Sequence, residues 1–114
     1  MSDTQALAPS EENFKALAIE NPEELLRWIA AGSLEAADLT FAAEAASMID
    51  DGKRVADALL PLLAHNIASV REGAIYGLAT HTSIEGVTAA LEKLSQEDPI
   101  AEIRIAATSA LSRT

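Results

Sequence analysis

The chain has 114 residues, a length that suits one domain with its own core, and it contains no cysteine. Disulfides, thiolate metal sites and thiol nucleophiles are therefore excluded. The formal net charge of −10 argues against binding to nucleic acid or to an anionic membrane, because both need a positive surface. Residues 1–51 hold eleven acidic side chains against Lys15 and Arg27, so most of the excess lies in the first half.

Neither a secretion signal nor a membrane span is expected. The N-terminus is acidic and polar, whereas a signal peptide is basic and then apolar. The longest apolar runs, such as 58–64, are too short to cross a bilayer. We therefore expect a soluble, cytoplasmic protein.

The first third of the chain predicts a tail and two helices. Residues 1–9 are small and polar and predict a flexible N-terminal tail. A short helix is expected from Ser10 onward. The next helix begins at Asn21 and Pro22, since asparagine caps helices and proline suits the first helical position, and it ends at Gly32.

The middle of the chain predicts two further helices. Ser33 is expected to cap a helix over 34–49, and the Asp-Asp-Gly sequence at 50–52 is expected to end it. The following helix, 53–64, contains Pro61, which removes a backbone donor and predicts a bend.

The last third predicts three helices. Ser-x-x-Glu and Thr-x-x-Glu have the spacing of capping boxes and predict helices over 69–80 and 82–95. An Asp-Pro pair begins the last helix, 98–113. No segment has the period-2 alternation of a strand, so the predicted fold class is all-α.

The second half of the chain contains an internal repeat. Its matches, each 33 residues apart, are Val70 with Ile103, Arg71 with Arg104, Ala74 with Ala107, and Leu78 with Leu111. Helical segments repeated at this period predict a solenoid. Read in pairs, the predicted helices make three units, with the first helix left over as a cap. In the first unit, Thr40 stands where the later units have arginine.

Over 98–104 (Asp-Pro-Ile-Ala-Glu-Ile-Arg), the chain resembles the HEAT-repeat family, in particular the HEAT-like repeat first named for phycobilisome lyases. The resemblance covers about residues 55–114, and 22–52 as a degenerate unit. It implies an all-α fold: a short right-handed α-solenoid of about three HEAT-like helix pairs plus an N-terminal capping helix. The single domain would then occupy residues 10–114.

The resemblance also implies structural roles for three polar residues. Asp98 is expected to form a hydrogen bond across its turn. Arg104, which repeats at Arg71, is expected to pair along the stack and to be structural rather than catalytic; whether it is buried and paired with Asp98 or exposed stays open. In the middle unit His65 replaces the aspartate.

No catalytic or metal-binding motif is present in the sequence. His65 and His81 are too far apart for an i, i+4 metal pair, and each is expected to satisfy a terminal carbonyl at the end of a helix. The acidic doublets lack calcium-loop spacing, and no P-loop, GxGxxG or Gly-x-Ser-x-Gly motif occurs. Proteins with this type of repeat include an iron-dependent hydroxylase, which binds its metal through paired His-Glu dipeptides. The chain has no such dipeptide. We therefore expect no enzyme, no cofactor and no metal.

The fifth predicted helix carries Gly73 and Gly77, each of which costs roughly 1 kcal/mol of helix propensity relative to alanine. The favoured explanation is close approach of a neighbouring helix. The alternative is a shallow groove beside Tyr76, in which the backbone of a partner lies. Three other aromatic residues are expected in the core: Phe14, Trp28 and Phe41.

The leading functional hypothesis is a small protein–protein interaction module, an adaptor, scaffold or regulatory subunit. The resemblance implies that the second helix of each unit lines the binding side. Helical register there predicts four outward-facing contact residues: Glu72, Tyr76, Ile105 and Ser109. Two alternatives stay open: an accessory factor of a lyase-like or chaperone-like activity, and an acidic inhibitor of a basic enzyme. The expected partner is another protein, for which a basic surface would match the acidic first half; its identity and the oligomeric state stay open.

Overall fold

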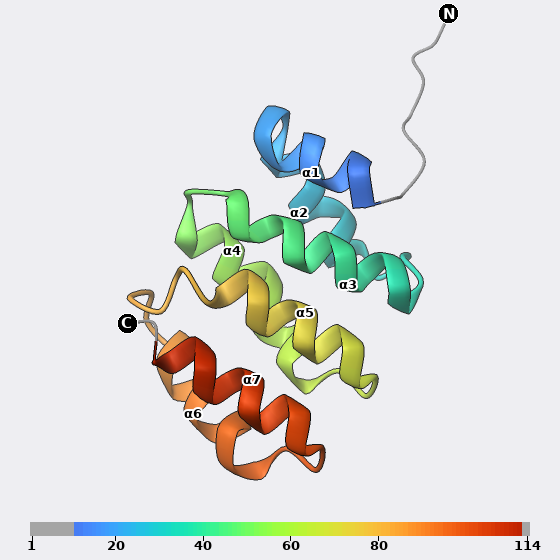
Figure 1. Ribbon diagram of the computed structural model, residues 1–114. Coiled ribbons are helices and arrows are strands. Elements are labelled where there is room, and N and C mark those ends of the chain that lie inside the picture. Colours follow the sequence, from blue (N-terminus) through green and yellow to red (C-terminus); the bar gives the residue numbers. More distant parts are fainter. Residues whose placement is uncertain (1–10, 113–114) are drawn as a thin grey trace, which may run out of the picture.

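The computed structural model describes residues 11–112, and within them it contains seven α-helices and no strand (Figure 1). The α-helices are α1 (Glu11–Glu20), α2 (Pro22–Ala31), α3 (Ala36–Ala45), α4 (Gly52–Leu59), α5 (Ala68–Leu78), α6 (Val87–Glu97) and α7 (Ala101–Leu111). Two 3-10 helices, η1 (Ala46–Met48) and η2 (Leu60–Ala64), continue α3 and α4. The predicted all-α class is confirmed. The predicted tail over 1–9 lies outside the described residues.

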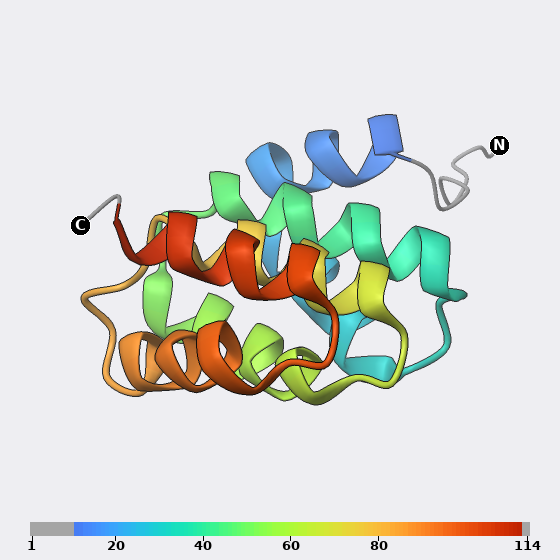
Figure 2. The ribbon, with the colours of Figure 1, turned by 60° about the horizontal axis from the view of Figure 1, so that its bottom comes forward.

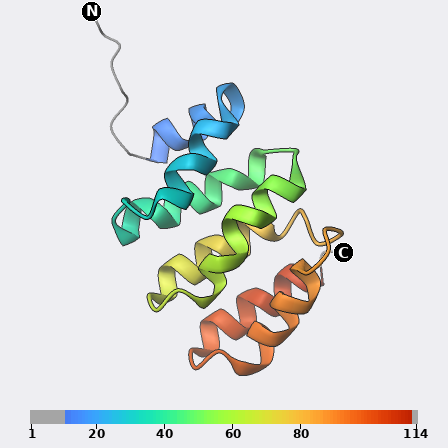
Figure 3. The same ribbon diagram turned by 180° about the vertical axis from the view of Figure 1, so that it is seen from behind.

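The α-helices lie in two layers. Figure 2 shows α3, α5 and α7 side by side in one layer and α2, α4 and α6 in the other, while α1 packs against α3. Seen from behind in Figure 3, α2, α4 and α6 form the near layer. The Cα radius of gyration is 13.8 Å, close to the roughly 13 Å of a compact globule of this length. The described chain is therefore a compact all-helical globule.

Some helix ends follow the local sequence signals. The Asn21 side chain accepts a hydrogen bond from the Glu24 N–H, and Gly32 closes α2 with a φ of 74°, as predicted. Pro61 lies in η2, where the α-helical pattern gives way to the tighter 3-10 form. Asp51 caps α4 by accepting a hydrogen bond from the Arg54 N–H, so this aspartate begins a helix as well as following one.

Four predicted helix starts are wrong. The actual N-cap residues of α3, α5, α6 and α7 are Glu35, Ile67, Gly86 and Ile100, and none of them makes a side-chain capping bond. The largest error concerns α6, which was expected from Thr82. The Thr82 carbonyl instead accepts a hydrogen bond from the Thr88 hydroxyl, and Gly86 turns the chain with a φ of 90°. Residues 79–86 are therefore a loop.

Gly73 and Gly77 allow α5 to lie very close to α3. A Cβ on Gly73 would lie 2.7 Å from the Thr40 carbonyl oxygen. A Cβ on Gly77 would collide with the Ala43 carbonyl oxygen and lie 2.5 Å from Cδ1 of Leu59. The predicted reason for both glycines, close approach of a neighbouring helix, is confirmed.

Two of the three aromatic residues expected in the core pack there. Phe14 is fully buried and meets Trp28 edge-on, with 6.4 Å between ring centroids. Trp28 is partly buried and donates its indole N–H to the Glu24 carboxylate. Phe41 is 37% exposed, so its predicted core position is wrong; the neighbouring small residues Ala42 and Ala43 occupy the buried stripe of α3.

The side of α6 and α7 that faces away from α4 and α5 is polar. Ile75 of α5 is buried beside α7, and Leu60 of η2 packs against the core. The matching positions of the last pair hold Thr108 and Glu92, and both are exposed. The apolar stripe that joins the second pair to the third therefore has no counterpart beyond α7.

Candidate functional site

The helices form three consecutive pairs, α2 with α3, α4 with α5, and α6 with α7. A buried ion pair joins the second of these pairs to the third. Nε of Arg71 donates to the Asp98 carboxylate at 2.7 Å, and the second terminal nitrogen donates to its other oxygen at 3.1 Å. The two side chains are only 9% and 2% exposed. The remaining Arg71 nitrogen donates to the His65 carbonyl at 2.8 Å, so the guanidinium contacts both the turn before α5 and the turn before α7.

The surroundings of Asp98 stabilise its charged form. Burial raises the pKa of its carboxyl, but the hydrogen bonds from Arg71 and the Ile100 N–H, with the charges of Arg71 and Arg104, outweigh burial and bring the pKa below its usual value. The bond from Ile100, at 2.9 Å, is the expected hydrogen bond across the turn.

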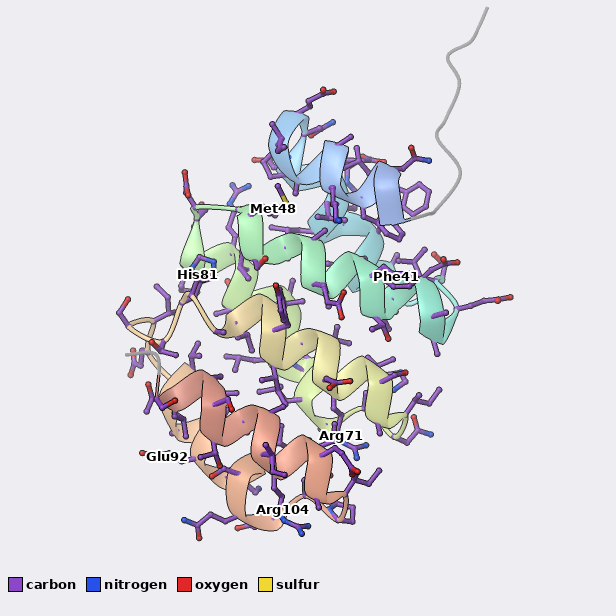
Figure 4. The ribbon with its side chains drawn as sticks, viewed as in Figure 1. Phe41, Met48, Arg71, His81, Glu92 and Arg104 are labelled. Atoms are coloured by element: carbon purple, nitrogen blue, oxygen red, sulfur yellow. The ribbon has the colours of Figure 1, made fainter. Side chains whose placement is uncertain are left out.

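Of the two alternatives left open for Arg104, pairing with the Asp98 carboxylate is not the one observed. Arg104 donates to the backbone carbonyl of Asp98 at 2.6 Å, the same six-residue contact that Arg71 makes with His65 (Figure 4). The carboxylate itself is occupied by Arg71 from α5. Arg104 therefore supports its own turn, and the link along the stack is made by the arginine one unit earlier.

Among the described residues, an exposed ion pair from Arg54 of α4 to Glu23 of α2 joins the first and second helix pairs, but no buried one does. Thr40, at the arginine position, donates its hydroxyl to the Ala36 carbonyl within α3. The Nδ1 atom of His65, at the aspartate position, accepts a hydrogen bond from the Ile67 N–H at 3.1 Å. His65 thus reproduces the turn bond of Asp98 but not its ion pair. Its expected role, donation to a terminal carbonyl, is wrong because the ring nitrogen acts as an acceptor.

His81 also differs from its expected role. It lies in the loop after α5, 9% exposed, near Gly52 at the start of α4 (Figure 4). Its Nε2 atom is buried and has no hydrogen-bond partner among the described residues. Burial of an unpartnered polar atom costs stability. The ring lies close against Gly52, where an added Cβ would be 2.9 Å from its Nδ1 atom.

Three of the four predicted contact residues line one hollow between α5 and α7. Its volume is about 170 Å³, and its lining residues are Glu72, Ile75, Tyr76, Ala79, Ala106, Ser109 and Ala110. Ile105, the fourth predicted residue, is 64% exposed on α7 and is not part of the lining. The structure therefore brings Glu72, Tyr76 and Ser109 together and leaves Ile105 beside them on the same helix as Ser109.

A second hollow adjoins the first across Tyr76. Its volume is about 260 Å³, and its lining residues are Lys15, Phe41, Glu44, Ala45, Ser47, Met48 and Tyr76. Phe41 and Met48 are 37% and 45% exposed (Figure 4). Met48 was not among the predicted contact residues. Phe41, Ala45 and Met48 recur at helical spacing in the sequence, but such spacing alone does not tell whether a residue is buried or exposed.

Two larger hollows lie on the side of α2, α4 and α6. One, of about 500 Å³, lies between η2 and α6 with walls that include Leu60, Leu63 and Leu94; the other, of about 470 Å³, lies between α2 and α4. Neither was predicted from the sequence.

Residues 11–112 contain neither a candidate metal site nor a candidate membrane span. Within residues 11–112, no group of three or more histidine, aspartate or glutamate side chains could hold a metal ion, and no described helix is long and apolar enough to cross a membrane. In comparisons with known proteins, no family model, curated protein or solved structure matches the chain.

Proposed function

We propose that the chain is a small non-enzymatic protein–protein interaction module, built as a short right-handed α-solenoid of three HEAT-like helix pairs with α1 as the cap. The two-layer order of the helices supports this arrangement. So does the recurrence of one contact, from Arg71 to the His65 carbonyl and from Arg104 to the Asp98 carbonyl.

The binding surface of the proposed module is the α3–α5–α7 face, defined by Phe41, Met48, Glu72, Tyr76, Ile105 and Ser109. The observation that carries the proposal is the gathering of large apolar side chains on this face. Phe41, Met48, Tyr76 and Ile105 are between 37% and 64% exposed. Exposed apolar side chains grouped in this way mark interaction sites, and tyrosine is enriched among the residues that dominate binding energy.

The shape of the face favours a protein over a small molecule. Its two hollows, of about 170 and 260 Å³, are smaller than the roughly 300–1,000 Å³ of small-molecule pockets. Because Tyr76 lines both hollows, a partner that contacts this ring can place side chains on either side of it.

The test uses the native partner, captured from cell extract with the wild-type chain and identified. Affinity for that purified partner is then measured for Tyr76→Ala and Ile105→Ser, and each is expected to weaken binding at least about tenfold without lowering the melting temperature. Lys53→Ala and Glu92→Ala, on exposed positions of α4 and α6, are the controls and should bind normally. Normal binding by both face variants, with loss in a control, would place the surface on the opposite layer and refute the proposal.

A further inference from the structure

Glu72 and Tyr76 lie one turn apart on α5, so their side chains leave the helix on the same face, with about 5–6 Å between Cβ atoms. Tyr76 is 57% exposed, and Glu72 is exposed as well. Among the described residues, nothing forms an ion pair or a side-chain hydrogen bond with Glu72. An exposed carboxylate that has no cation partner among the described residues therefore lies one helical turn from an exposed tyrosine ring.

The hollow beside these two residues is mostly apolar. Its other lining residues are Ile75, Ala79, Ala106 and Ala110, with Ser109 adding one hydroxyl from α7. Two alanines of α7, Ala106 and Ala110, and Ala79 directly after α5 leave room for an inserted stem of methylene groups. The volume of about 170 Å³ suits one long side chain rather than a bulky group.

These features together fit a cation carried on an aliphatic stem. We propose that the hollow receives an arginine side chain of the partner protein, an inference that rests on the proposed function of the α3–α5–α7 face. The stem lies against the alanines, while the guanidinium stacks on the Tyr76 ring and pairs with the Glu72 carboxylate.

Other side chains fit the hollow less well. An acidic side chain would be repelled by Glu72. A purely apolar one would remove water from that carboxylate without replacing its hydrogen bonds, which costs free energy. Lysine could pair with Glu72, but its ammonium is a compact, strongly hydrated charge, whereas the planar guanidinium can stack on the ring and donate two parallel bonds at once.

The inference is tested with a defined probe, so the partner need not be known. Nα-acetyl-arginine N-methylamide is titrated into the ¹⁵N-labelled full chain, and amide chemical shifts are followed by NMR. Saturable shifts are expected around Glu72, Tyr76 and Ser109. The matched citrulline probe, which has nearly the same shape without the charge, should bind several-fold more weakly, and the lysine probe should fall between the two.

Variants then assign the contacts. Glu72→Gln and Tyr76→Leu should each weaken arginine binding about 2–5-fold, the worth of an exposed ion pair or cation–π contact. Tyr76→Phe should retain binding, because the ring remains. Glu92→Gln on α6 is the charge-matched control and should change nothing.

The two proposals fail in different ways. Equal binding of arginine and citrulline, or arginine shifts that map to α2, α4 and α6, would overturn the arginine site. If Tyr76→Ala and Ile105→Ser still weaken the native partner, the interaction face survives that result. If those two variants bind the partner normally, the interaction face itself is wrong, whatever the probe does.

Discussion

The Asp98 carboxylate takes its two charged hydrogen bonds from Arg71, 27 residues earlier, whereas Arg104 reaches only the backbone carbonyl of Asp98. The two arginines occupy matching positions in the sequence repeat but stabilise different parts of the fold. Arg71 holds two helix pairs together, and Arg104 holds the turn that begins α7.

This difference predicts unequal losses of stability. Arg71→Leu leaves the buried Asp98 carboxylate without its counter-charge and should cost about 3–5 kcal/mol. Arg104→Leu loses one hydrogen bond and should cost about 1 kcal/mol. Urea unfolding followed by circular dichroism measures both values. Adding Asp98→Asn to the Arg71 variant should recover part of its loss, and equal losses for the two single variants would contradict the assignment.

Acid should weaken the same junction. Because the pKa of Asp98 is lower in the folded protein than its usual value of about 3.9, the ionised carboxylate stabilises the fold at neutral pH. That contribution is complete above about pH 5 and is lost as the pH falls through the unfolded pKa toward the folded one. The stability difference between wild type and Asp98→Asn should therefore be largest near pH 7 and shrink below about pH 4.

The control for the acid experiment is Asp57→Asn, which removes an exposed carboxylate paired with Lys53. Its effect should be small at every pH, because exposed ion pairs contribute little. A wild-type advantage over Asp98→Asn that stays constant from pH 7 to pH 3 would show that the Asp98 charge does not stabilise the fold.

The sequence predicted what depends on local periodicity and on single turns. The all-α class, the ends of α2 at Asn21 and Gly32, and the close approach at Gly73 and Gly77 all follow from the types of residue present. The turn bond of Asp98, which the family resemblance implied, is also local, because it links residues two apart.

What the sequence could not supply depends on how the helix pairs meet. The partner of Asp98 is fixed by the position of α5 against α7, which no local spacing encodes. One signal was nevertheless present: Thr40 and His65 replace the arginine and the aspartate together at the first junction. The exposure of Phe41 also depends on how the helices meet. The stripe of α3 that faces its neighbours holds the buried Ala42 and Ala43, and Phe41 lies outside that stripe.

A third prediction concerns the contact between α3 and α5. Gly77→Ala gains roughly 1 kcal/mol of helix propensity, but the new methyl group would collide with the Ala43 carbonyl. Overpacking typically costs about 1–3 kcal/mol, so after that gain a net destabilisation of up to about 2 kcal/mol is expected in urea unfolding. Gln96→Ala, on an exposed position of α6, should leave the midpoint unchanged. A stabilised Gly77 variant would show that α3 and α5 can separate freely.

The two histidines give a matched pair of substitutions. His81→Leu removes a buried nitrogen that has no partner and should leave stability unchanged or raise it by about 1 kcal/mol. His65→Leu removes an acceptor used by the Ile67 N–H and should cost about 1 kcal/mol. Thermal melts of both variants measure the difference. A strong loss at His81 would mean that its ring is needed for a bond in the native protein.

The polar outer side of α6 and α7 determines how this protein could be lengthened by design. A helix pair appended after α7 would meet Glu92 and Thr108 instead of an apolar stripe. A copy of residues 67–99 inserted after Pro99 would instead supply an arginine on one side and an aspartate on the other, restoring the Arg71–Asp98 type of junction at each new boundary. In the proposed stack, new helix pairs can therefore be inserted before the last pair, and α6 and α7 keep their polar side at the end of the lengthened stack.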